Sequence, residues 1–249
     1  MNFPGKEFQP ITTATVPDSL DFDPFAKKYL GGIDLYAHGE IAYAFSVAKR
    51  AHAGKPRDTG GPYFEHPLMC TIYAIEVGFT QPSLLIATLL HDVQEDSLRY
   101  LITAEVTMEE VRRGDTGGVP KSELVNERLK YGNSILIAEE FGTSPAKIVH
   151  ALTKSKGMSE RTHVEKIRKG PAPCRPVKGF DRLHNLRTLP SDNPNRIRRK
   201  VDETRELFMP LFEMGAKDFP GPGERLLWLI NLELERLEAG LREPTPEPV

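Results

Sequence analysis

The sequence predicts an all-α protein, and three observations support that fold class. Apolar residues recur at intervals of three and four in successive segments, which is the spacing of amphipathic helices. No segment shows a convincing alternation of apolar and polar residues, which would indicate a half-buried strand. Glycines and prolines separate the segments from one another, as expected for the connections between helices.

Composition places the chain among ordinary globular proteins. Its 249 residues suit one large domain or two small ones, and 39% are hydrophobic while 27% are charged. A formal charge of −2 gives no general attraction to nucleic acid or to an acidic membrane surface. Cys70 and Cys174 are too few for a disulfide framework, and no apolar run is long enough to span a membrane. We therefore expect a cytoplasmic protein.

The amino-terminal half begins with an irregular arm and continues into helices. Four prolines and a glycine pair in residues 1–32 predict the arm, with a short helix near its end. Apolar spacing then predicts a helix that ends near His52, and a loop with three glycines or prolines in succession follows at 60–62. Pro67 fits the first turn of the next helix, and Pro82 that of the helix after it. The helices expected here are 25–30, 33–52, 67–77 and 82–96.

The carboxy-terminal half returns to helical spacing after a charged, glycine-containing stretch. That stretch, about 98–134, is predicted to be an insertion within a helical domain that spans 33–241. Three prolines predict a loop at 170–176, and the tail at 242–249 alternates proline with acidic residues and is expected to be disordered. The helices expected here are 134–141, 144–154, 158–169, 177–189, 196–214 and 223–241.

One stretch, LLIATLLHDVQED at 84–96, carries the chemistry of the sequence. Its apolar half predicts a buried helix, and its second half ends in one imidazole and three carboxylates. On a continuous helix His91 lies over Glu95, and Asp92 lies over Asp96. Carboxylates near a core are costly unless a cation compensates them, so the stretch predicts a bound cation.

Four side chains from separate segments form a plausible ligand set for that cation. They are His52, His91, Asp92 and Asp181. Mixed nitrogen and oxygen ligands without cysteine favour manganese, iron or nickel over structural zinc. Each residue taken alone has an ordinary explanation as well, such as a helix cap for His52 or an ion pair with Arg182 for Asp181.

The order of five motifs resembles the hydrolase domain of the RelA/SpoT alarmone family. The motifs are AHAGKPR at 51–57, GGPYFEHP at 60–67, LLHDVQED at 89–96, TK at 153–154 and DRLHNLRTL at 181–189. The similarity covers roughly residues 40–213 and is interrupted by the insertion. The resemblance implies an HD-domain phosphohydrolase, a helical bundle that uses manganese to remove the 3′-pyrophosphate from guanosine tetra- or pentaphosphate.

The resemblance also assigns roles to residues of this chain. It implies that His52, His91, Asp92 and Asp181 hold the metal. Glu95 and Asp96 match the acidic pair that positions and activates the attacking water. Asn185 matches a residue that contacts the nucleotide near the reacting phosphate.

Residues near these motifs receive weaker assignments. Lys55 and Arg57 lie on the glycine-rich loop beside His52 and are predicted to hold the pyrophosphate, although a solvated basic loop explains them equally well. His66 is predicted to fix this loop through a hydrogen bond. His163 and His184 are predicted to be surface or packing residues.

One position departs from the family pattern and opens two further hypotheses. The family carries an arginine that stacks on guanine nine residues before the first metal-binding histidine, and counting from His52 places Tyr43 there. A tyrosine ring can still stack on a base. The substrate could then be another nucleotide, such as an adenine alarmone or the 2′-phosphate of NADPH. A non-catalytic nucleotide-binding module is the third hypothesis, and the sequence leaves homo-oligomerisation open.

Overall fold

The computed structural model describes residues 19–58, 60–96, 120, 122, 134–190 and 193–242, except for the side chains of 95, 96 and 134–136. Within these ranges the chain forms helices and no strand, so the all-α prediction is confirmed there. A single β-bridge joins Pro56 to Pro62 within a loop. The first half of the predicted arm, nearly all of the predicted insertion and the tail at 243–249 lie outside the described residues.

The helices follow the predicted order with different boundaries. None of those in the described ranges is long and apolar enough to cross a lipid bilayer. They are α1 (Phe22–Tyr29), α2 (Leu35–Ala51), α3 (Glu65–Glu76), α4 (Pro82–Leu90), α5 (Val93–Asp96), α8 (Ser134–Phe141), α9 (Thr143–Leu152), α10 (Glu160–Lys169), α11 (Cys174–Arg187), α12 (Pro194–Glu203), the π-helix η1 (Thr204–Phe208), α13 (Met209–Asp218) and α14 (Pro222–Arg242).

Two boundaries differ from the prediction for identifiable reasons. The helix expected at 82–96 is interrupted at His91, whose Nδ1 lies 2.8 Å from the Thr88 carbonyl oxygen that the next helical turn would use. The expected stacking of His91 over Glu95 therefore does not follow from one continuous helix. Helix α11 begins at Cys174, within the predicted loop, because prolines in a first helical turn lose no helical hydrogen bond.

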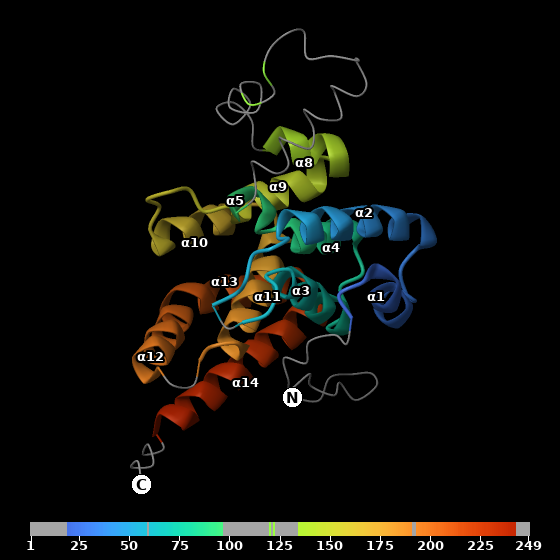
Figure 1. Cartoon of the computed structure of the whole chain (residues 1–249). Helices are drawn as coiled ribbons and strands as arrows, with labels where there is room; N and C mark the ends of the chain where they lie inside the picture. Colours follow the sequence, from blue (N-terminus) through green and yellow to red (C-terminus); the bar gives the residue numbers. More distant parts are fainter. Residues whose placement is uncertain are drawn as a thin grey trace.

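Helix α11 lies in the centre of the bundle and packs against α3, α9, α13 and α14. Figure 1 shows α2 and α4 side by side above it, with α14 running along the opposite side. The four predicted core positions of α11 are each 1% exposed or less, which confirms them; they are Val177, Phe180, Leu183 and Leu186. The same helix therefore anchors the core and carries Asp181 to the candidate site.

A close approach of α14 to α11 depends on a glycine. A Cβ atom at Gly179 would lie 2.8 Å from Cδ2 of Leu226, which is closer than side-chain contacts allow. The absence of that atom lets α14 pack directly against the helix that carries Asp181.

We expect Gly179→Val to lower the free energy of unfolding by about 1–3 kcal/mol, because the added atoms overpack the contact with Leu226. Gly240 on α14 has no atom within 4 Å of an added Cβ, so Gly240→Val should change stability by about 0.5 kcal/mol or less. Urea unfolding followed by circular dichroism measures both values. Equal stability of the two variants would contradict this packing account.

Candidate metal centre

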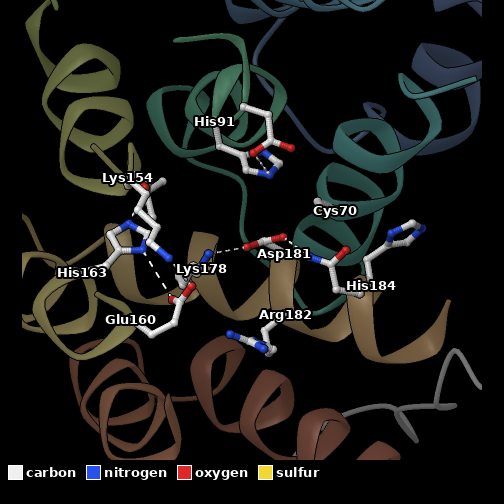
Figure 2. Close-up of polar contacts among 12 residues, drawn as sticks. Cys70, His91, Lys154, Glu160, His163, Lys178, Asp181, Arg182 and His184 are labelled. Carbon is white, nitrogen blue, oxygen red and sulfur yellow. Dashed lines mark hydrogen bonds and ion pairs between the residues drawn. The ribbon is translucent and has the colours of Figure 1, made fainter. Parts of the chain in front are cut away.

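Two histidines and two aspartates from three parts of the bundle converge on one point. His66 lies in the first turn of α3, His91 and Asp92 lie between α4 and α5, and Asp181 lies on α11. The Nε2 atom of His66 is 3.3 Å from Nε2 of His91, 3.3 Å from Oδ1 of Asp181 and 3.5 Å from Oδ2 of Asp92. The Nε2 atom of His91 is 3.3 Å from Oδ1 of Asp92. Figure 2 shows His91 facing Asp181 across this point.

Hydrogen bonds behind the two histidines determine which ring nitrogens carry protons. His91 Nδ1 lies 2.8 Å from the Thr88 carbonyl oxygen, which only accepts, so this Nδ1 donates. Arg57 Nη1 lies 3.0 Å from His184 Nδ1, and a guanidinium only donates, so that Nδ1 accepts. His66 Nδ1 lies 2.9 Å from the same His184 atom and must therefore donate to it. In the neutral rings, both His66 and His91 then present an unprotonated Nε2.

This arrangement directs two nitrogen lone pairs and two carboxylates at each other. Lone pairs 3.3 Å apart repel, and the aspartates add negative charge, so a cation between them would relieve the repulsion. Burial lowers the pKa of His66, which disfavours a proton as that cation. Burial, together with His66 and Arg57, lowers the pKa of His184 to about 2 and keeps its Nδ1 an acceptor. Neutral imidazoles held through Nδ1, with Nε2 exposed, are the usual form of metal-binding histidines.

The two carboxylates are oriented by their own partners. Tyr63 donates its hydroxyl to Asp92 Oδ2 over 3.0 Å, and Lys178 donates to Asp181 Oδ2 over 2.6 Å. Asn185 donates to the other oxygen of Asp181. Burial alone would raise the pKa of Asp181, but the ammonium group of Lys178 holds it well below the usual value. Both aspartates are thus ionised and fixed in direction, as metal ligands require.

A buried thiol lies on the other side of His66. Among the described residues, His66, Cys70 and His91 place their ligand atoms within 4.8 Å of one another and could hold a metal ion. The Cys70 Sγ atom is 3.8 Å from Nδ1 of His66, the nitrogen that donates to His184. Burial raises the pKa of the Cys70 thiol well above its usual value, and a protonated thiol is a poor ligand. The carboxylates on the Nε2 side therefore suit a metal better than this sulfur.

The structure places His52 differently from the other three predicted ligands. His52 is 1% exposed, and its ring stacks on Tyr63 with 4.7 Å between centroids. Neither ring nitrogen has a hydrogen-bond partner among the described residues, and burial lowers its pKa to about 4. The imidazole that lies with His91, Asp92 and Asp181 is that of His66. The sequence places His66 in the first turn of an apolar helix, as it places His91 at the end of one, but only the fold shows that the two rings meet.

The remaining predicted residues fall into three groups. Arg57 donates to Asn185 Oδ1 over 3.1 Å, and both line the cleft described below. Lys55 is half-buried outside that cleft lining, and Tyr43 stacks on Phe141 and donates to Glu140 over 2.9 Å, also outside it. The predicted catalytic pair, Glu95 and Asp96, lies in α5, but their side chains lie outside the described part of the structure.

A cleft of about 500 Å³ opens beside the candidate metal centre. Asp92 and Asp181 lie on its wall, together with Tyr63, Glu160 and Asn185. Its cationic lining comes from four parts of the chain and consists of Arg57, Lys154, Lys178, Arg182, Arg196 and Lys200. A polar cleft with an excess of cations suits a ligand that carries several negative charges.

The adjoining loop turns sharply to present Arg57. Gly60 and Gly61 have φ values of 85° and 76°, which glycine adopts at little cost. The turn is closed by hydrogen bonds from the Arg57 amide to the Gly61 carbonyl, 3.1 Å, and from the Gly60 amide to the Arg57 carbonyl, 3.0 Å. Arg57 therefore reaches His184 and Asn185 on α11 from a fixed loop.

Comparison with known proteins identifies relatives of this chain. No family model matches it. A GTP pyrophosphokinase of Streptomyces coelicolor is 31% identical over 179 residues, which are 69% of this chain and 17% of that protein. A guanosine-3′,5′-bis(diphosphate) 3′-pyrophosphohydrolase of Haemophilus influenzae is 33% identical over 175 residues, which are 66% of this chain and 21% of that protein. The chain thus spans about a fifth of the length of these curated relatives.

A solved structure is also similar to the fold. It is described as a metazoan orthologue of SpoT that hydrolyses ppGpp, and it is 16% identical with a TM-score of 0.48. The alignment covers 79% of this chain and 94% of that one.

The proton positions derived above can be tested directly. We expect both His66 and His91 to carry their proton on Nδ1 in the metal-free protein at neutral pH, because each Nδ1 faces an acceptor. Long-range ¹H–¹⁵N correlation spectra of histidine-labelled protein distinguish the two tautomers. A proton on Nε2 of either ring would remove the reason for a cation at this point.

Proposed function

We propose that this chain, a distant homologue of the RelA/SpoT family of alarmone enzymes, is an HD-type, metal-dependent phosphohydrolase. Its proposed reaction removes the 3′-pyrophosphate from guanosine tetraphosphate and yields GDP and pyrophosphate. The two relatives above carry the names of a synthetic and a hydrolytic enzyme, so homology leaves the direction open. The converging His66, His91, Asp92 and Asp181 side chains favour hydrolysis, because a divalent metal activates water for attack on phosphorus.

The proposed ligands are His66, His91, Asp92 and Asp181, with His66 in the place that the sequence assigned to His52. Two nitrogen and two oxygen donors suit manganese or a similar divalent ion. When bound, the metal would supply charge stabilisation at the phosphoryl oxygens and lower the pKa of a water molecule. Four protein ligands leave further positions open on an ion that prefers six.

Moving the first histidine to His66 also changes which residue lies nine positions before it. That residue is Arg57, whose guanidinium lies on the cleft wall beside Asn185. We propose that Arg57 takes the guanine-stacking role and that Asn185 contacts the nucleotide near the reacting phosphate. Tyr43, which lies outside the cleft lining, loses that role, and with it the observation that favoured another base.

The acid–base chemistry of the proposed reaction rests on Glu95 and Asp96. Each follows a proposed metal ligand by four residues, and α5 begins directly after those ligands. A carboxylate near the metal can accept a proton from the attacking water. Tyr63 and Lys178 hold Asp92 and Asp181 in place, so the proposed roles of holding the metal and of moving the proton fall on different residues.

Purified protein should release pyrophosphate and GDP from guanosine tetraphosphate when manganese is supplied. Chelation should abolish the release, and added manganese should restore it, because the proposed reaction needs the cation. Chromatographic product analysis measures both. Protein that binds one equivalent of manganese and releases neither product would contradict the proposed substrate.

Two substitutions test whether His66, and not His52, is a metal ligand. His66→Gln should lower manganese affinity about tenfold or more, since a ligand is lost and two carboxylates stay behind. His52→Gln should retain wild-type affinity, because the His52 ring contacts Tyr63 instead of the metal position. Isothermal titration with manganese compares the two. Loss of affinity in His52→Gln, with His66→Gln unchanged, would restore the assignment made from sequence.

A further inference from the structure

A second hollow, of about 660 Å³, lies among α8, α9 and α10, away from the candidate metal centre. Helix α9 packs against both of the other helices (Figure 1). The hollow shares no lining residue with the cleft that contains Asp92 and Asp181. Its volume lies within the usual range for a pocket that binds one small ligand.

The floor of this hollow is built from small apolar residues. Ala138 lies on α8, Ala146 and Ala151 lie on α9, and Gly170 and Pro171 follow α10. A Cβ atom added at Gly170 would lie 3.0 Å from Cβ of Ala151, so the chain after α10 passes close to α9 without a side chain between them. A contiguous apolar surface that the protein leaves open commonly marks a site of interaction.

Backbone groups at the ends of both helices beside the hollow have partners within the protein. Lys166 donates to the carbonyl oxygens of His150 and Thr153 over 2.6 and 2.9 Å. The amide of Gly170 donates to the carbonyl oxygens of Lys166 and Ile167 over 3.1 and 3.0 Å. An extended peptide would bring N–H and C=O groups that need partners, whereas an alkyl chain brings none. The walls therefore suit an alkyl chain better than an extended peptide.

The rim of the hollow is positively charged. Among the described residues that line it, none is acidic, and the basic ones are Lys147, His150, Lys166 and Lys169. Lys166 is engaged by the carbonyl oxygens named above, and Lys169 lies 3.2 Å from Glu165. Lys147 is exposed and has no ion-pair or hydrogen-bond partner in the described part of the chain. An apolar hollow beside an ammonium group is complementary to an amphiphile with an anionic head group.

The shape of this face favours a single molecule over a bilayer surface. Helices that bind the membrane interface insert large apolar side chains into the lipid. Among the described residues, the exposed side chains of that kind lie on α2 and α14; they are Leu35, Tyr36, Tyr43 and Leu232. The surface at α8, α9 and α10 is instead recessed and lined by alanines, which suits an occupant that enters it as a monomer.

We propose that this hollow binds a free long-chain fatty acid, with the alkyl chain against the alanines of α8 and α9 and the carboxylate beside Lys147. The inference goes beyond the proposed function and is independent of it, because the hollow and the cleft have separate linings. It predicts an affinity that depends on both alkyl length and head-group charge.

Displacement of the fluorescent fatty acid cis-parinaric acid from the full chain tests this site. Palmitate should displace one bound equivalent. Octanoate, with half the chain length, should bind about tenfold more weakly or worse, because it buries fewer methylene groups. Hexadecanol has the alkyl length of palmitate without its charge and should also bind about tenfold more weakly. Absence of displacement by palmitate, or equal affinity for palmitate and octanoate, would overturn the proposal.

A matched pair of charge reversals tests the position of the head group. Lys147→Glu should weaken palmitate binding about tenfold or more and change hexadecanol binding by less than about threefold, because only palmitate is charged. Lys156→Glu makes the same charge change at an exposed residue outside both linings and should retain the wild-type affinity. An equal loss in the two variants would show general electrostatic attraction and reject the site.

A third variant tests the apolar end of the hollow. Ala138→Phe places a ring in the space proposed for the alkyl chain and should weaken palmitate and hexadecanol binding alike, by about tenfold or more. The melting temperature shows whether the variant is folded, and the charge reversals decide the question if it is not. A folded Ala138→Phe protein with wild-type affinity would contradict an alkyl chain at this place.

Other occupants would give different results in the same experiments. A membrane-binding face would give cosedimentation with phosphatidylglycerol vesicles, and a second copy of the chain would give a dimer that Ala138→Phe dissociates. Either result without displacement of cis-parinaric acid by palmitate would overturn the proposal. Because these assays need neither manganese nor nucleotide, failure of the protein to hydrolyse guanosine tetraphosphate would reject the proposed function alone.

Discussion

The close approach of two imidazole nitrogens beside two aspartates is the constraint on which the candidate site depends. Each ring carries its proton on Nδ1, which donates to a partner behind the ring. The Nε2 atoms of His66 and His91 lie 3.3 Å apart beside two ionised aspartates. A folded core does not normally keep such a group together without a cation. A divalent ion between the rings would instead bind both nitrogen lone pairs, so the arrangement favours metal binding.

The bundle maintains this arrangement through contacts that begin far from it. A loop turned by two glycines presents Arg57 to His184, and His184 in turn fixes the proton of His66. Because the helix is interrupted after Leu90, the backbone carbonyl of Thr88 can accept from His91 Nδ1 and fix the proton of that ring. Helix α11 anchors the core through one face and carries Asp181 and Arg182 on another. Core packing and the tautomers of the site are therefore linked.

Much of the fold and part of the site could be predicted from the sequence. Helical spacing gave the order of the helices because each amphipathic segment must bury one face, and His91 and Asp92 were conspicuous where an apolar helix ends. The start of α11 at Cys174 was not predicted because the prolines of 170–176 indicate a loop, although prolines in a first helical turn lose no helical hydrogen bond. The sequence analysis gave His66 a structural role because a histidine before Pro67 is typical of a loop or helix start, and only the folded chain shows that its Nε2 atom lies 3.3 Å from that of His91.

The choice of the first metal-binding histidine decides which residue is assigned to the base. Counting from His52 placed Tyr43 at the base-binding position, whereas counting from His66 places Arg57 there, on the cleft wall. The proposed base-binding residue therefore depends on which histidine is taken as the first metal ligand, and the proposed choice of His66 rests on the distances from its Nε2 atom to His91, Asp92 and Asp181.

Anomalous X-ray diffraction at the manganese absorption edge, on crystals of the manganese-loaded protein, tests the central claim most directly. The account predicts one strong peak bonded to Nε2 of both His66 and His91, with Asp92 and Asp181 completing the protein ligands. A peak beside His52 or Cys70, or no peak within the four-residue cluster, would contradict it.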